Sequence, residues 1–145
     1  MCDRPGIAER LQRAISRVYE EDRTLIDIEV HERTIAARLA IYLVDMFPEW
    51  DVDCEYNRDR RNPKVILDRR AYPDVIIHLR NTGANLLAVE MKGHWSADDR
   101  EHDFRKLASL TGPDFEYELG VHIELCPHTF ELRWFADGLP VEVPE

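Results

Sequence analysis

Hydrophobic residues recur at helical spacing in three segments of the chain. The first segment predicts an amphipathic helix over about residues 6–20, with an apolar face of Ile7, Leu11, Ile15, Val18 and Tyr19. The second predicts a longer helix over about residues 30–47, which ends before Pro48 because proline cannot continue it. The third predicts a helix over about residues 98–111, ended by Gly112-Pro113.

Between and after these helices, short apolar or alternating runs predict β-strands. They cover residues 51–56, 65–67, 74–80, 85–92, 120–126 and 129–135. The two central runs meet across Asn81-Thr82-Gly83-Ala84, a sequence typical of a hairpin turn. This order of elements predicts one α/β domain over residues 1–145, with a central mixed β-sheet flanked by α-helices.

Composition narrows the class of protein. The three cysteines, Cys2, Cys54 and Cys126, form no CxxC pair, which favours a cytoplasmic protein and argues against a disulfide framework or a zinc site. No run is long and apolar enough to span a bilayer, and the N-terminus lacks the apolar core of a signal peptide. We therefore expect no association with a membrane.

Charge is unevenly distributed along the chain. The formal net charge is −10, which disfavours strong non-specific binding to nucleic acid. Six basic residues nevertheless lie in one short segment: Arg58, Arg60, Arg61, Lys64, Arg69 and Arg70. This basic segment is either a solvated loop or a surface that contacts phosphates.

Two carboxylates and a lysine stand at the ends of the two central predicted strands. Glu90 and Lys92 share one face, because side chains alternate along a strand, and Asp74 lies beside Glu90 if the strands pair. Adjacent carboxylates repel unless a cation lies between them, and oxygen ligands suit Mg²⁺ or Mn²⁺. Lys92 could then hold an attacking water or stabilise charge on a phosphate. The alternative is a surface ion pair between Glu90 and Lys92.

Glu32 supplies a third acid near the start of the second predicted helix. Its spacing to Ile35 and Leu39 places it on the core-facing side of that helix. The helix dipole favours an anion at this position, which is one reason for its presence. The other is that Glu32 points into the same site and orients a metal-bound water.

These residues resemble the motif of the PD-(D/E)xK nuclease superfamily, which has the restriction-endonuclease-like fold. The resemblance covers about residues 20–126 and is closest to a group of small bacterial proteins of that superfamily. The stretches that carry it are Glu32–Ala36, Cys54–Arg58, Tyr72–His78, Asn85–Lys92, Asp103 with Lys106–Leu107, and Tyr117 ahead of Gly120.

The resemblance implies a role for each residue of the motif. Asp74 and Glu90 would bind the metal together with the backbone carbonyl of Met91. Lys92 would be the catalytic lysine and Glu32 the helix acid. All four side chains would therefore take part in catalysis.

Three further positions lie close to the motif or are brought to it by the resemblance. It brings Lys106 towards the site and its nucleic acid, although spacing alone predicts a simple pair with Asp103 on one helix. Gly93 departs from the pattern, since such proteins often carry a second lysine there. Trp95, just after the motif, is either a packing residue or a platform on which a base stacks.

Two functions follow as alternatives. The first is a Mg²⁺- or Mn²⁺-dependent nuclease that hydrolyses DNA phosphodiester bonds, as a homodimer or with a partner protein that supplies specificity. The second is a catalytically silent protein of the same fold that binds nucleic acid or protein. The intact Asp74, Glu90 and Lys92 favour the first. The acidic net charge and the lack of room for a target-recognition domain favour the second, or a nuclease with a partner.

Overall fold

The protein is an α/β structure built on a six-stranded mixed sheet, seen in a computed structural model that describes residues 2–54, 65–66, 69–70, 73–142 and 144. The strand order is β1-β4-β5-β6-β7-β8. The strands are β1 (Asp51–Cys54), β4 (Val75–His78), β5 (Asn85–Gly93), β6 (Leu119–Leu125), β7 (Phe130–Ala136) and β8 (Leu139–Val141). A separate two-stranded ladder joins β2 (Val65–Ile66) and β3 (Arg69–Arg70).

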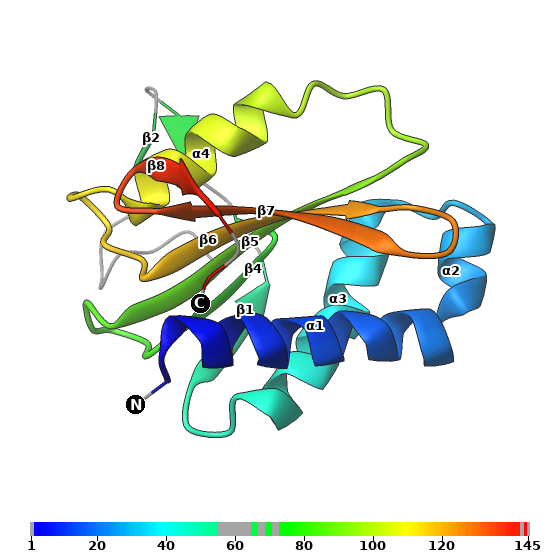
Figure 1. Cartoon of the computed structure of the whole chain (residues 1–145), viewed down its shortest axis with the longest axis horizontal. Helices are drawn as coiled ribbons and strands as arrows, with labels where there is room; N and C mark the ends of the chain where they lie inside the picture. Colours follow the sequence, from blue (N-terminus) through cyan, green and yellow to red (C-terminus); the bar gives the residue numbers. More distant parts are fainter. Residues whose placement is uncertain (1, 55–64, 67–68, 71–72, 143, 145) are drawn as a thin grey trace.

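The described residues form four helices, arranged on both faces of the sheet (Figure 1). They are α1 (Arg4–Glu21), α2 (Arg23–Asp27), α3 (Glu32–Met46) and α4 (Glu101–Thr111). Helix α4 lies on one side of the sheet, while α1 and α3 lie on the other (Figure 1). No helix in the described part of the chain is long and apolar enough to cross a membrane.

Most predicted elements are confirmed, with small shifts at their ends. Helix α1 begins earlier than predicted because the Asp3 carboxylate accepts a hydrogen bond from the backbone N–H of Gly6, and Pro5 suits the first turn. The short helix α2, the two-residue strand β3 and the edge strand β8 were not predicted. Strand β1 ends at Cys54, and the rest of the strand predicted over 51–56 lies outside the described residues.

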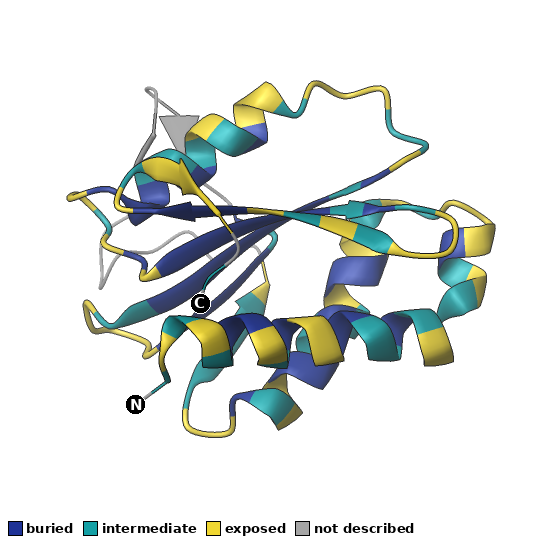
Figure 2. Ribbon diagram, in the orientation of Figure 1, coloured by how far each residue is buried: buried dark blue, intermediate teal, exposed yellow. Residues whose placement is uncertain are grey.

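Strand β5 is the centre of the sheet. It pairs antiparallel with β4 through the predicted turn and parallel with β6, and α4 provides the crossover that a parallel pair needs. Its residues from Leu86 to Met91 are all buried, as Figure 2 shows for the middle of the sheet. The side chains of β5 therefore lie against helices on both faces.

Alternation along the strands gives the two faces different chemistry. On the side of α1 and α3, which we call the α3 face, apolar side chains such as Val75, Val89 and Val121 join the helices in the larger core cluster. The opposite side, the α4 face, has a smaller apolar cluster around Leu107. A Cβ atom added to Gly120 would lie 3.2 Å from Leu107, so α4 approaches β6 closely.

Candidate active site

The carboxylates of Asp74 and Glu90 meet on the α4 face, where β4 and β5 pair. Val75 lies opposite Val89, which brings the preceding and following residues, Asp74 and Glu90, to the same end of the ladder. The Asp74 carboxylate accepts a hydrogen bond of 2.8 Å from the backbone N–H of Met91. The predicted juxtaposition of the two acids is therefore confirmed.

Lys92 lies on the same face as Glu90, two residues further along β5. Its Nζ atom is 3.3 Å from Oδ2 of Asp103 on α4, and its side chain is 19% exposed. The alternative of a surface pair between Glu90 and Lys92 is wrong, because each pairs with α4 instead.

Lys106 pairs with Glu90. Helical spacing alone had predicted a pair with Asp103, and that prediction is wrong. The Nζ atom of Lys106 is 2.5 Å from Oε1 of Glu90. Helix α4 thus presents an anion to the lysine of the sheet and a cation to the glutamate of the sheet. The resemblance had indicated that Lys106 lies at the site, and the structure places it there.

His122 completes this buried polar group and was not singled out by the sequence. It lies opposite Glu90 on β6, and its Nε2 atom is 3.4 Å from Oδ2 of Asp103. The side chains of Asp103 and His122 are only 5% and 4% exposed. The parallel register of β5 and β6 is the signal that could have found His122, but the sequence did not establish that pairing.

Burial controls the protonation of the two carboxylates. Burial raises the pKa of Glu90 well above its ordinary value, and the Asp74 carboxylate raises it further, while Lys106 offsets part of the rise. Burial also raises the pKa of Asp74, against contacts with Glu90 and the Met91 N–H that lower it. Two buried acids in contact repel, and a proton or a cation relieves the repulsion.

Lys92 and Asp103 stabilise each other as charged groups. Burial raises the pKa of Asp103, but His122 and then Lys92 lower it, and the net result is below the ordinary value. Burial lowers the pKa of Lys92, but Asp103, Asp74 and Glu90 together raise it by more, so that the net pKa is raised. Lys92 is therefore an ammonium ion at neutral pH.

Glu32 reaches the C-terminal end of β5 from the first turn of α3. Its carboxylate accepts a hydrogen bond of 3.1 Å from the backbone N–H of Gly93, next to Lys92. This places Glu32 at the edge of the site. A Cβ atom at Gly93 would lie 2.3 Å from the Trp95 ring, which explains why no larger side chain stands there. Trp95 packs against the core on this side of the sheet.

Arg100 links the chain segments at the end of the site. Its contacts there were not predicted from the sequence. Its guanidinium donates to the Glu124 carboxylate at 2.8 Å and 3.1 Å, and to the Gly93 carbonyl at 3.0 Å. The same group donates to the carbonyl oxygens of Ser96 and Asp98. Arg100 therefore ties the loop after β5 to the ends of β5 and β6.

The basic segment that was predicted to contact nucleic acid lies largely outside the described residues. Arg58, Arg60, Arg61 and Lys64 lie outside the described residues. Only the backbone of Arg69 and Arg70 is described, in the ladder of β3 with β2.

The chemistry of the donor set fits a hard divalent cation. Oε1 of Glu90 is fully buried and lies 2.5 Å from the Lys106 ammonium, so that Glu90 and Asp74 offer carboxylate oxygens in a site shielded from solvent. No cluster of three or more His, Cys, Asp or Glu side chains suited to a metal occurs in the described ranges. Mg²⁺ needs fewer, because it keeps several waters and takes one or two protein carboxylates.

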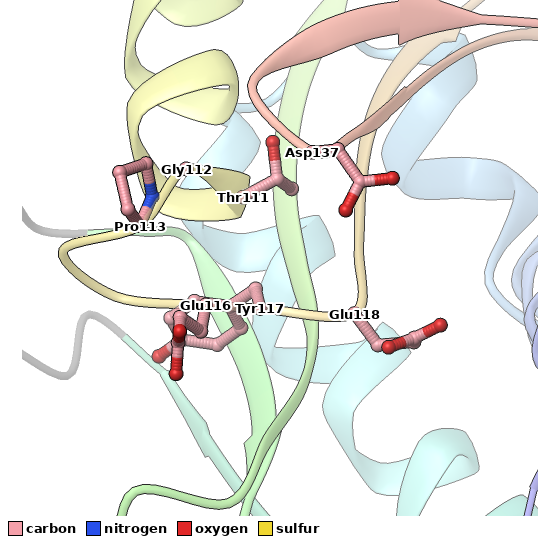
Figure 3. A pocket seen from close by; sticks show the side chains of 7 residues that line it. All are labelled: Thr111, Gly112, Pro113, Glu116, Tyr117, Glu118 and Asp137. Atoms are coloured by element: carbon pink, nitrogen blue, oxygen red, sulfur yellow. The ribbon is translucent and has the colours of Figure 1, made fainter.

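A separate hollow of about 330 Å³ lies at the C-terminal end of α4 (Figure 3). Three acids line it, Glu116, Glu118 and Asp137, and Arg4 pairs with the last two. None of the residues predicted to carry chemistry lines this hollow.

Comparison of the chain with models of known protein families gave no match, and neither did comparison with curated protein sequences.

Proposed function

We propose that this protein is a nuclease of the PD-(D/E)xK superfamily, with the restriction-endonuclease-like fold, that uses Mg²⁺ or Mn²⁺ to hydrolyse DNA phosphodiester bonds. The observation that supports this most strongly is that Asp74 and Glu90 lie together at the end of the β4–β5 pair, with Lys92 on the same face two residues further along β5. Burying such charges costs free energy, and core packing alone gives no reason for it.

Asp74 and Glu90 would hold the cation, with the Met91 carbonyl as a further ligand. When bound, a divalent cation withdraws charge from the phosphate and lowers the pKa of a water molecule. The Lys92 ammonium, fixed by Asp103 at 3.3 Å, would stabilise the negative charge that develops on the phosphate. Glu32 would orient the attacking water from the edge of the site.

Nucleic acid would approach through positive charge. The basic segment from Arg58 to Arg70 directly precedes the Asp74 strand in the sequence, and its side chains would contact the phosphate backbone. Lys106 would join these contacts at the site itself. Because the whole chain carries a net charge of −10, the affinity would depend on this local surface, on a second copy, or on a partner protein.

The direct test is DNA cleavage by the purified protein. Plasmid, linear and single-stranded DNA are incubated with Mg²⁺ and then Mn²⁺, using wild type, Glu90→Ala and Glu131→Ala. Glu131 is an exposed glutamate on β7 and serves as the matched control. We expect wild type and Glu131→Ala to cut and Glu90→Ala to lose cutting. If wild type binds DNA but cuts none of these substrates, the catalytically silent binding protein becomes the better description.

A further inference from the structure

Lys106 occupies the position of a counter-ion in the carboxylate pair. Its Nζ atom lies 2.5 Å from Oε1 of Glu90, and the two side chains are only 15% and 3% exposed. The ammonium hydrogen-bonds the carboxylate and lowers the pKa of Glu90, against the larger effect of burial. The ammonium is thus the positive charge that lies against Glu90 in this structure.

The pairing of Lys106 is a property of the tertiary structure and not of its helix. Asp103 lies three residues earlier on α4 and would be the local partner. Asp103 is instead held by Lys92 and His122, at 3.3 Å and 3.4 Å. Lys106 therefore reaches across to the sheet, where the only carboxylate paired with it in the described residues is that of Glu90.

A divalent cation at Glu90 and the Lys106 ammonium attract the same carboxylate and repel each other. Mg²⁺ binds carboxylate oxygens at about 2.0–2.1 Å, closer than the ammonium lies, in a site shielded from solvent. Two positive charges on one buried carboxylate repel strongly because solvent screens them little. Occupation of Glu90 by one cation therefore weakens the hold of the other.

We propose that Lys106 is a resident counter-ion that competes with the divalent cation for Glu90. The proposal rests on the proposed function, since it assumes that Asp74 and Glu90 bind a metal. Lys106 thus has two positions. It lies on Glu90 when the metal is absent, and it leaves that carboxylate when the metal binds. Its ammonium is then available to a phosphate of the nucleic acid.

The competing account gives Lys106 a supporting role only. If its ammonium merely orients Glu90 for the metal, removing it should weaken metal binding. If it competes, removing it should strengthen metal binding. The sign of the change in metal affinity therefore distinguishes the two accounts.

The test is isothermal titration of Mn²⁺ into wild type, Lys106→Met and Arg105→Met. Arg105 is the adjacent, exposed cation on α4, so Arg105→Met makes the same change in net charge away from the site. Measurements at about pH 8 keep the carboxylates available, since metal ligands must be deprotonated. We expect Lys106→Met to bind Mn²⁺ about tenfold more tightly or better, the scale on which one neighbouring charge alters proton affinity of a carboxylate. Arg105→Met should match wild type.

Two further variants separate the possible outcomes. Asp74→Asn should lose Mn²⁺ binding if the carboxylate pair is the metal site. Equal or weaker binding by Lys106→Met, with binding lost in Asp74→Asn, would overturn the competition and leave the metal site intact. Absence of binding in wild type and in every variant would overturn both the competition and the proposed function. If Lys106→Met does not fold, Lys106→Gln replaces it and must show the same gain in affinity.

Discussion

The two faces of the central sheet use the same strands for opposite purposes. On the α3 face, Val75, Val89 and Val121 are fully buried among apolar neighbours. On the α4 face, Glu90 and His122 are buried almost as completely, although they are polar. Burial of apolar groups stabilises a fold, whereas burial of charge costs free energy unless partners satisfy it. The comparison indicates that stability depends chiefly on the α3 face, and it agrees with the proposal that the chemistry takes place on the α4 face.

The largest expected effect concerns catalysis on the α4 face. Lys92→Ala should lower the cleavage rate at least about a hundredfold, the scale of losing one group that stabilises transition-state charge. Metal binding should remain, because a protonated lysine is not a ligand. The measurement pairs a cleavage assay with Mn²⁺ calorimetry on the same preparation. Equal cleavage by Lys92→Ala and wild type would show that the roles assigned within Glu90-Met91-Lys92 are wrong.

On the α3 side, the expected loss is one of stability. Leu39 on α3 is fully buried, and Leu39→Ala should lower the free energy of unfolding by about 2–5 kcal/mol. Ile41 on the same helix is 50% exposed, and Ile41→Ala should cost less than about 0.5 kcal/mol. Urea unfolding of both variants measures the difference. Similar losses for the two would mean that α3 does not pack on the sheet as described.

Gly93, the last residue of β5, should tolerate little change. Gly93→Ala should cost about 1–3 kcal/mol, because its methyl group would collide with the Trp95 ring. In a Trp95→Ala background the same substitution should cost much less. A double-mutant cycle of unfolding free energies measures this coupling. Additive effects of the two substitutions would show that the close contact does not limit residue 93.

The smallest expected effect is a pH dependence of stability caused by Glu90. Because burial raises its pKa in the folded protein, Glu90 favours folding below its ordinary value of 4.5, and this contribution is lost as pH rises through the folded pKa. Glu90→Gln imitates the protonated acid, so its melting temperature should exceed that of metal-free wild type at neutral pH. The two should converge towards pH 4.5. Parallel curves from acid to neutral pH would contradict the assignment.

The sequence predicted the strand ends of the site but not the contributions of α4. Period-two alternation and the hairpin turn were sufficient to bring Asp74 beside Glu90, because both signals are local. The pairing of Lys106 with Glu90 depends on how α4 packs across β5 and β6. Local spacing favoured Asp103 as its partner, and tertiary packing overrode that preference.

The elements that were not predicted likewise lack a local sequence signal. Strand β8 contains only Leu139-Pro140-Val141, too short for alternation to be visible, and it forms by pairing with β7. Helix α2 has five residues, fewer than hydrophobic periodicity can define. Arg100 likewise acquires its partners only when β5, β6 and the loop between them come together.

The central claim is that Asp74 and Glu90 together bind a divalent cation, and thermal unfolding with and without Mn²⁺ tests it most directly. A metal that binds only the folded protein raises its melting temperature by mass action. Asp53→Ala is the matched control, since Asp53 lies on the neighbouring strand β1 and pairs with His78 and Arg80. We predict that Mn²⁺ raises the melting temperature of wild type and Asp53→Ala but not of Asp74→Ala. An equal rise in wild type and Asp74→Ala, or no rise in wild type, would contradict the claim.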